Sequence, residues 1–223
     1  MRSPYAYLSA AGGGGAAGWT GLDLSASSAG QDVNSQISGV TASSVTIANG
    51  AATYTSVSDA ACRYWDASGV ITGAGLLMLE LELSAAIPNT AAIGIGMAAD
   101  GDDLTTSPSM WAGRKLGPTF PTFANVWAKW GSAITTNNSN QYISHRIIGV
   151  MAICDSDGSV ATIYDYSRDD SGNGQAYTVT PSQAAAATGT FSEFILTAAR
   201  TADAGSATTV TISGIRYQFI AAN

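Results

Sequence analysis

Residues 75–84, GLLMLELELS, decide the fold class because apolar and polar side chains alternate along them. Every second residue is a leucine: Leu77, Leu79, Leu81 and Leu83. The residues between them include Met78, Glu80 and Glu82. Side chains two positions apart lie on the same face of a β-strand, so this segment has one apolar face and one more polar face. We predict a strand whose leucine face meets the core.

Two hairpins are predicted from turn residues that lie between alternating segments. Residues 44–55, SVTIANGAATYT, carry Asn49-Gly50 at their centre, which suits a type I′ turn because both central residues need a positive φ. A two-residue loop there fixes the register of the two strands. The predicted pairs are Val45 with Tyr54 and Ile47 with Ala52. Residues 153–166, ICDSDGSVATIYDY, predict a second hairpin through an Asp/Ser/Gly turn.

Other segments carry further strand patterns. Residues 91–99, AAIGIGMAA, are predicted to point Ile93, Ile95 and Met97 inward, and residues 145–154, HRIIGVMAIC, are apolar on both faces, as in a central strand. Residues 190–200 and 208–222 are predicted to be the C-terminal strand pair. In the last strand the apolar parity changes at Ser213-Gly214, which predicts a β-bulge if both sets of side chains face the core.

These patterns predict an all-β protein, an antiparallel two-sheet β-sandwich of the jelly-roll type. We expect one sandwich domain over residues 41–223. Residues 1–40 are predicted to form an extended Gly/Ser/Ala-rich arm, because a glycine run at 12–15 separates the N-terminal aromatic residues from the first clear strand. The expected docking residues of this arm are Tyr5, Tyr7 and Leu8. A disordered terminus is the alternative.

The composition limits the classes of partner. Only 11% of the residues are charged, and 9 Lys and Arg against 16 Asp and Glu give a net charge of −7. Binding to nucleic acid depends on clustered cations, so a nucleic-acid partner is not expected. No apolar stretch reaches the length of a membrane span, so membrane insertion is not expected either. The start of the chain is a poor match to a signal peptide, because four glycines interrupt its apolar run.

Few residues offer nucleophilic or metal chemistry. Cys62 and Cys154 lie far apart in strand-like segments, and two buried free thiols are favoured over a disulfide, which would need their strands to meet. His145 is the only histidine, and the chain has no G-x-S-x-G sequence, so a Ser-His-Asp hydrolase is not indicated. A structural or exposed histidine is the favoured interpretation.

Glu80 and Glu82 have the spacing of a candidate acid pair. They share one strand face about 6–7 Å apart, a distance within the range that glycosidases use. The favoured alternative is that both form the solvent-facing side of an amphipathic strand. On that interpretation, changing both to Gln has little effect on stability, and no catalytic residue is expected.

Three acidic loops contain Asp beside Ser, Asn or Gly: 100–103, 155–158 and 169–174. Carboxylate and amide oxygens suit Ca²⁺, and Asp169, Asp170 and Asn173 are the best weak candidates for metal ligands. None of the loops matches the EF-hand spacing, and ordinary turns require the same residue types. The turn interpretation is favoured, and no cofactor is expected.

Residues 100–142 have weak strand patterns but hold three of the five tryptophans. Long loops in compact domains are often functional, and tryptophan rings stack on sugar faces while Asn side chains bond to hydroxyls. The candidate ligand-binding residues are Trp111, Trp127, Trp130, Asn138 and Tyr142. The alternative is that these tryptophans fill the core or a subunit interface.

The hairpin at 153–166 and the closing strand TVTISGIRYQFI at 209–220 resemble parts of concanavalin A-like and carbohydrate-binding-module sandwiches. The Ala/Gly/Thr-rich sequence with its glycine arm also resembles accessory virion proteins of tailed bacteriophages and gene transfer agents: head decoration proteins, head fibres and tail receptor-binding proteins. This resemblance implies a non-enzymatic virion protein, a homo-oligomer that contacts other virion proteins and displays a jelly roll for attachment to host-surface glycans. The alternatives are a polysaccharide-degrading enzyme and a secreted sugar-binding adhesin.

Overall fold

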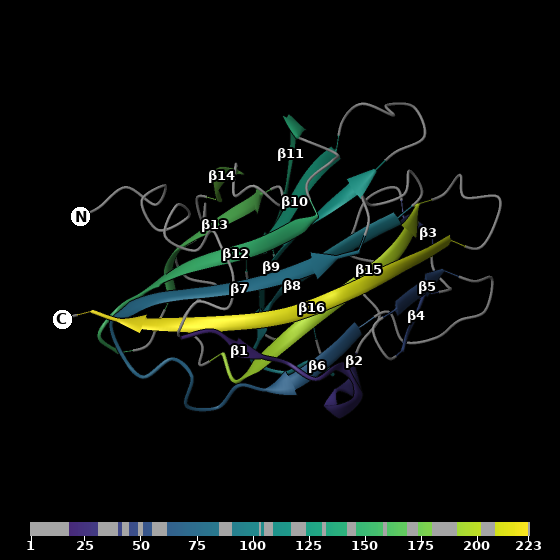
Figure 1. Cartoon of the computed structure of the whole chain (residues 1–223). Helices are drawn as coiled ribbons and strands as arrows, with labels where there is room; N and C mark the ends of the chain where they lie inside the picture. Colours follow the sequence, from purple (N-terminus) through teal and green to yellow (C-terminus); the bar gives the residue numbers. More distant parts are fainter. Residues whose placement is uncertain are drawn as a thin grey trace.

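The computed structural model describes residues 18–30, 40–41, 45–48, 51–54, 62–84, 91–102, 104, 109–116, 124–130, 133–141, 146–157, 160–168, 174–179, 191–201 and 208–222. These residues form two antiparallel sheets that pack face to face as a sandwich (Figure 1). The predicted all-β, two-sheet class is therefore confirmed. No helix in the described part of the chain has the length and apolar character of a membrane span.

The first sheet, here the β7 sheet, has the strand order β14-β13-β12-β7-β16-β5-β4, with β1 paired to β16. Its strands are β14 (Gly174–Val179), β13 (Val160–Arg168), β12 (Ile147–Cys154), β7 (Gly75–Leu83), β16 (Thr208–Ala221), β5 (Ala51–Tyr54), β4 (Val45–Ala48) and β1 (Thr20–Gly21).

The second sheet, here the β8 sheet, has the order β11-β10-β9-β8-β15-β6-β2, with β3 paired to β15. Its strands are β11 (Ala133–Gln141), β10 (Ala124–Trp130), β9 (Ser109–Leu116), β8 (Ala91–Ala98), β15 (Glu193–Thr201), β6 (Cys62–Asp66), β2 (Ser28–Gly30) and β3 (Val40–Thr41). A 3-10 turn, η1 (Leu24–Ala26), follows β1. Among the described strands the chain passes from one sheet to the other repeatedly, for example between β6 and β7, between β7 and β8, between β11 and β12 and between β15 and β16.

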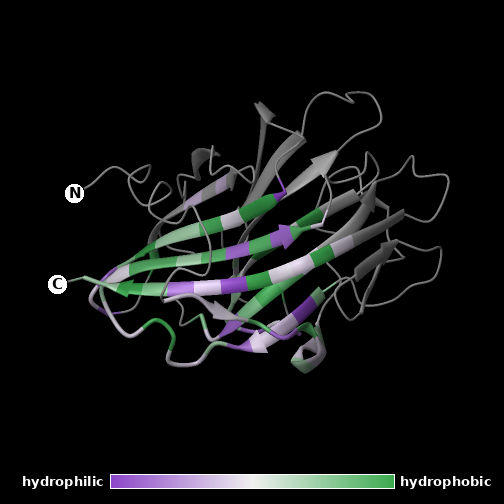
Figure 2. Ribbon diagram, viewed as in Figure 1, coloured by the Kyte–Doolittle hydropathy of each residue, from purple (hydrophilic) through white to green (hydrophobic). Residues whose placement is uncertain are grey.

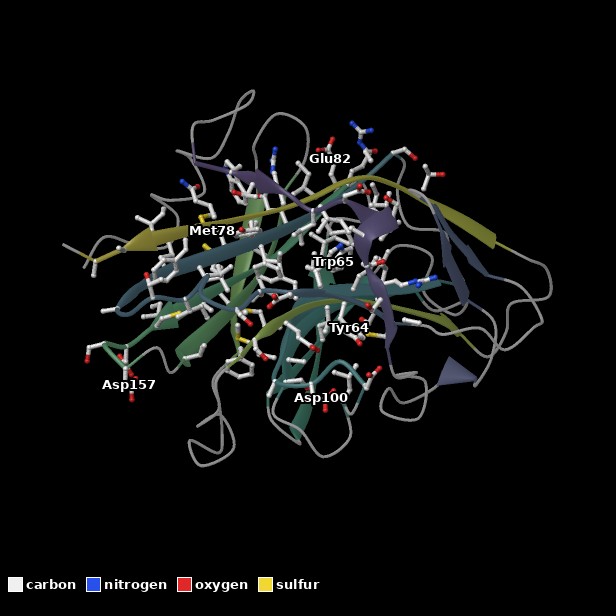
Figure 3. The ribbon with its side chains drawn as sticks, turned by 90° about the horizontal axis from the view of Figure 1, so that it is seen from below. Tyr64, Trp65, Met78, Glu82, Asp100 and Asp157 are labelled. Carbon is white, nitrogen blue, oxygen red and sulfur yellow. The ribbon has the colours of Figure 1, made fainter. Side chains whose placement is uncertain are left out.

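The core lies between the sheets and is built from the alternating residues of the central strands. The β7 sheet contributes Leu77, Leu79, Leu81, Leu83, Ile148, Val150 and Ala152, and the β8 sheet contributes Ile93, Ile95, Met97, Phe194 and Leu196. Trp65 lies between the two sheets (Figure 3). Burial of these apolar faces is the main favourable term for the fold. The predicted leucine face of β7 and the inward face of β8 are both confirmed.

Both predicted hairpins are present. β4 and β5 pair Val45 with Tyr54 and Ile47 with Ala52, as predicted from the Asn-Gly pair. β12 and β13 form the second hairpin, with β12 lying between β13 and β7 as a central strand.

The predicted bulge in the closing strand is also present. The register between β16 and β7 shifts between Ile212 and Gly214, so Ser213 has no paired residue on β7. The shift brings Ile212 and Ile215 into the same core although their parities differ, because one extra residue reverses the alternation.

Residues 100–142 differ from the sequence expectation of a long loop. Three of their segments form β9, β10 and β11 at one end of the β8 sheet. β11 consists largely of Thr, Asn and Ser, and β9 carries Gly, Arg and Lys, so hydrophobic alternation does not identify them. Their pairing to β8 and to each other supplies the backbone hydrogen bonds that the sequence pattern does not show.

Residues 18–30 differ from the expected free arm. β1 pairs with β16 through Thr20 and Gly21, and β2 pairs with β6 through residues 28–30. Leu22 and Leu24 pack against the main core. This part of the predicted arm is thus part of the sandwich, whereas Tyr5, Tyr7 and Leu8 lie outside the described residues.

Candidate functional site

A polar network lies on the outer face of the β7 sheet, on the side opposite the leucine core. Glu80 on β7 is paired with Arg216 on β16 and with Gly149 on β12, and Gly149 is paired with Tyr166 on β13. Residues paired across antiparallel strands share a face, so these four form one row across the sheet. Hydrophilic bands of β7 and β16 lie side by side (Figure 2).

Gly149 allows the row to close. A Cβ atom at this position would lie 2.3 Å from Cζ of Tyr166, so the tyrosine ring occupies the space above the glycine. The ring thereby spans β12, and Tyr166 Oη donates a hydrogen bond of 2.9 Å to Oε1 of Glu80. Any larger residue at position 149 would displace the ring and weaken this bond.

Arg216 completes the network from the other side. Its Nε and Nη2 atoms donate to Oε2 of Glu80 at 2.8 and 2.7 Å. Its guanidinium lies 4.8 Å from the ring centre of Trp19, within the range of a cation–π contact. The Glu80 side chain is 1% exposed and that of Arg216 is 31% exposed, so the ion pair has one buried end and one partly hydrated end.

Glu80 is therefore not solvent-facing, so the predicted interpretation of a solvent-facing polar side is wrong for this residue. The physical reason is that the outer face is itself apolar here: Met78 and Met151 are buried beside Tyr166, and Trp19 packs against them. We accordingly expect a change of Glu80 to Gln to lower the stability. Glu82 behaves differently. It is half-buried and lies on the outer side of the β7 sheet (Figure 3).

Two open pockets lie beside this network. The first, of about 250 Å³, is lined by Trp19, Gly21, Glu80, Glu82, Gly214, Ile215 and Arg216. The second, of about 320 Å³, is lined by Leu22, Asp23, Leu24, Ser25, Ile212, Ser213, Gly214 and Ile215. Gly214 and Ile215 belong to both, so the pockets adjoin each other along β16.

The first pocket combines an aromatic ring with hydrogen-bonding groups. The hydrogen bonds from Arg216 to Glu80 use Nε and Nη2, and a guanidinium has five N–H groups, so Arg216 has further donors for a ligand. Glu82 contributes a half-buried carboxylate, an acceptor of up to two hydroxyl donors. Both oxygens of Glu80 are already bonded to Tyr166 and Arg216. This arrangement can bind hydroxyl groups, but it offers one accessible carboxylate in place of the pair that glycosidases use.

A second polar cluster lies on the outer face of the β8 sheet. Gly101 donates its backbone N–H to Glu193, and Tyr64 Oη donates to Oδ2 of Asp102 at 3.3 Å. Burial, together with the charges of Asp100 and Asp102, raises the pKa of Glu193 above its ordinary value. Burial also raises the pKa of the Tyr64 hydroxyl. Within the described ranges, no group of three or more His, Cys, Asp or Glu side chains is arranged to hold a metal.

The two cysteines are both free and buried, in β6 and β12 of opposite sheets. The favoured sequence interpretation of two buried thiols is therefore confirmed. Burial raises the pKa of the Cys154 thiol to about 11.

The predicted tryptophan residues do not share one face. The backbone of Trp111 pairs with Gly96, and that of Trp127 pairs with Gly113, which itself pairs with Gly94. These positions therefore belong to the outer face of the β8 sheet, since Ile95 and Met97 fill the inner one. Position 130 pairs with Met110 of the core and belongs to the inner face.

The other predicted site residues lie on a different strand from the tryptophans or outside the described residues. Asn138 lies in β11, and Tyr142 lies outside the described residues. The weak metal candidates Asp169, Asp170 and Asn173 also lie outside them. Trp19, Tyr166 and Arg216 were not among the site residues predicted from the sequence. One available signal was that 145–154 is apolar on both faces, which implies a covered outer face beside Glu80.

No family model matches the chain, and neither does any curated protein. Among solved structures, the CBM2 module of the evolved Dit of Lactobacillus casei BL23 phage J-1 superposes with a TM-score of 0.51 and 11% identity, over 94% of this chain and 93% of that one. The fold is similar to that of a phage module.

Two further structures superpose with lower TM-scores. A protein of unknown function from Shewanella oneidensis MR-1 has a TM-score of 0.47 and 15% identity, over 98% of this chain and 95% of that one. Scytalido-glutamic peptidase, solved with a peptide-based transition-state analogue, has a TM-score of 0.37 and 11% identity, over 68% and 71% of the two chains.

Proposed function

We propose that this chain is a non-enzymatic carbohydrate-binding β-sandwich and a structural component of a bacteriophage particle. The observation that carries the proposal is the open pocket lined by Glu82, Arg216 and Trp19, in which the guanidinium lies over the tryptophan ring. The likeness to a phage CBM2 module over nearly the whole chain supports the same class of protein. Fold alone does not define function, so the pocket is the stronger argument.

The pocket chemistry favours a hydroxyl-rich ligand. A carboxylate and a guanidinium side by side can accept from and donate to neighbouring hydroxyls, and charge-assisted hydrogen bonds of this kind are stronger than neutral ones. An aromatic side chain adds a flat apolar surface for the C–H face of a sugar ring. Trp19 is half-buried, and Arg216 and the outer-face residues hold it in place.

The same contacts argue against hydrolysis. A glycosidase needs two carboxyl groups with different pKa values, one of them free to give a proton. Both oxygens of Glu80 accept hydrogen bonds, Oε1 from Tyr166 and Oε2 from Arg216. Glu82 is then the one accessible carboxylate among the residues that line this pocket, which suits binding.

The test is a glycan-array measurement with the purified wild-type chain and two variants, Glu82→Gln and Trp19→Ala. We expect the wild type to bind a defined set of glycans and both variants to lose about tenfold or more in affinity, a difference of about 1.4 kcal/mol. Glu82→Gln keeps the size of the side chain, and none of the hydrogen bonds described above depends on it, so a loss of binding there does not arise from unfolding. Failure of the wild type to bind any glycan on the array would contradict the proposal.

The particle assignment has its own test. We propose that the N-terminal residues, including Tyr5, Tyr7 and Leu8, dock the chain on other virion proteins. Deleting residues 2–17 should leave the unfolding transition of the sandwich unchanged and abolish incorporation into particles. Normal incorporation of the truncated chain, or neighbouring genes that encode no capsid, portal or tail protein, would contradict the assignment.

A further inference from the structure

The long strand β16 has an unpaired stretch on one edge. β5 pairs with its residues 208–211, and β1 pairs with Arg216 and Tyr217 on the same side. Among the described strands, none pairs with residues 212–215 on this edge. Leu22 donates a single hydrogen bond of 2.8 Å to the carbonyl of Ile215. The stretch is where the two pockets meet.

The bulge adds polar backbone to this stretch. Ser213 has no paired residue on β7, and a bulge leaves the extra residue outside the ladder. Ser213 is exposed and lines the second pocket together with Asp23 and Ser25. The second pocket thus combines hydroxyl and backbone groups with apolar side chains of Leu and Ile, while the first offers a ring, a carboxylate and a guanidinium.

Two glycines leave the surface between the pockets open. A Cβ atom on Gly214 or on Gly21 would meet nothing within 4 Å. Gly214 lines both pockets and Gly21 lines the first. Neither has a positive φ. Backbone strain therefore does not explain these glycines, and a side chain at either position would enter the space that connects or lines the pockets.

We propose that the two pockets form one groove that binds a non-acidic oligosaccharide of two or more units, running from Trp19 across Gly214 to Ser213. This inference rests on the proposed function and specifies its ligand. The unpaired stretch of four residues, 212–215, is roughly 13 Å long at about 3.3 Å per residue, longer than a single sugar ring. The flanking strands β1 and β5 limit it, so an added peptide strand would pair over only about four residues.

Charge excludes acidic chains. Among the described residues that line the two pockets, the charged ones are Glu80, Glu82, Asp23 and Arg216. Glu80 and Arg216 neutralise each other as an ion pair. Glu82 and Asp23 remain, so the groove has a net negative charge that repels uronic acids and phosphate-bearing polymers and tolerates neutral or amine-bearing sugars.

The experiment is a calorimetric titration with neutral oligomers of glucose, galactose and N-acetylglucosamine, one to four units long, and with oligogalacturonate as the acidic probe. The proteins are the wild type, Gly214→Trp, Gly21→Leu and the control Ala221→Trp. Ala221 is exposed on the same strand, outside both pockets. Thermal unfolding of each variant verifies the fold, and Gly21→Leu replaces Gly214→Trp if the latter is unstable.

We expect at least one neutral series to bind about tenfold tighter as a trimer than as a monosaccharide. Gly214→Trp should remove this gain, and Ala221→Trp should keep it. If the affinity for the sugars is independent of their length, or if Gly214→Trp still binds longer sugars more tightly, the proposal of one continuous groove is wrong. The proposed function would remain valid in that case. Tightest binding of the acidic probe would also overturn it. If no sugar binds to the wild type, both proposals fail.

Discussion

Replacing Glu80 with glutamine tests the outer-face network directly. The new side chain can present its oxygen to Arg216 and its amide N–H to the hydroxyl of Tyr166, which can also accept. The number of hydrogen bonds is then preserved and only the charge is lost. Hydrogen bonds to charged groups contribute about 1.5–3 kcal/mol and neutral ones about 0.5–1.5, so the bond with Tyr166, which becomes neutral, weakens by about 1 kcal/mol. The two bonds from Arg216 keep a charged donor but lose the ionic attraction of the carboxylate.

Hydration of Arg216 reduces this effect, because its side chain is 31% exposed. We therefore expect Glu80→Gln to lower the free energy of unfolding by about 1–2 kcal/mol. Glu80→Met removes both carboxylate acceptors, including the one that the buried Tyr166 hydroxyl uses, and we expect a loss of about 2–4 kcal/mol. Denaturant unfolding at pH 7 measures both values.

The matched control is Glu82→Gln on the same face of the same strand. Glu82 is half-buried, and none of the hydrogen bonds described above depends on its charge, so its change should stay within about 0.5 kcal/mol. In thermal unfolding, the loss in Glu80→Gln corresponds to about 2–8 °C for a domain of this size. If Glu80→Gln and Glu82→Gln have equal stabilities, the network does not stabilise the fold and the reasoning is refuted.

Three further predictions concern other parts of the sandwich. Gly149→Ala should destabilise the chain by about 1–3 kcal/mol, since its Cβ atom collides with the buried ring of Tyr166; an unchanged unfolding midpoint would contradict this. Cys62 and Cys154 should resist a thiol reagent at pH 8 until denaturant is added, because both are buried. For Cys154, a pKa of about 11 also leaves only about one thiol in a thousand ionised at that pH. Rapid labelling of the native chain would show that the thiols are accessible. The pKa of Glu193 is higher in the folded chain than in the unfolded chain, mainly because of burial. The protonated side chain therefore favours the folded state, and this contribution to stability is lost as the pH rises through the folded-state pKa. Glu193→Gln should therefore gain stability relative to wild type as the pH rises from about 4 to about 7, and an opposite trend in urea unfolding would reject the assignment.

The parts of the fold that local patterns determine were predictable from sequence. Leucines at every second position of 77–83 identify a core strand whatever its neighbours are, and Asn49-Gly50 sets a register without reference to the rest of the chain. The bulge at Ser213 follows from a change of parity within one strand. Each of these signals comes from one short segment of the chain.

The site depends on contacts that local patterns do not contain. Glu80 becomes buried because Tyr166, 86 residues away, reaches across Gly149, and because Arg216, 136 residues away, lies opposite on β16. An alternating Leu/Glu strand has the same sequence pattern whether its polar face meets solvent or a covering layer. The glycine-rich sequence before Trp19 predicts an arm, whereas strand pairing through Thr20 and Gly21 brings this tryptophan to the sheet.

The location of the binding site is tested most directly by the indole N–H signals of the five tryptophans in a ¹⁵N-labelled chain, assigned by single Trp→Phe changes. The titrant is the tightest-binding neutral oligosaccharide from the calorimetric series. We predict that the Trp19 signal shifts with the saturation curve of the ligand, while the signals of Trp111, Trp127 and Trp130 stay in place. A shift of those three signals with an unmoved Trp19 would place the site on the β8 sheet and contradict the pocket beside β16.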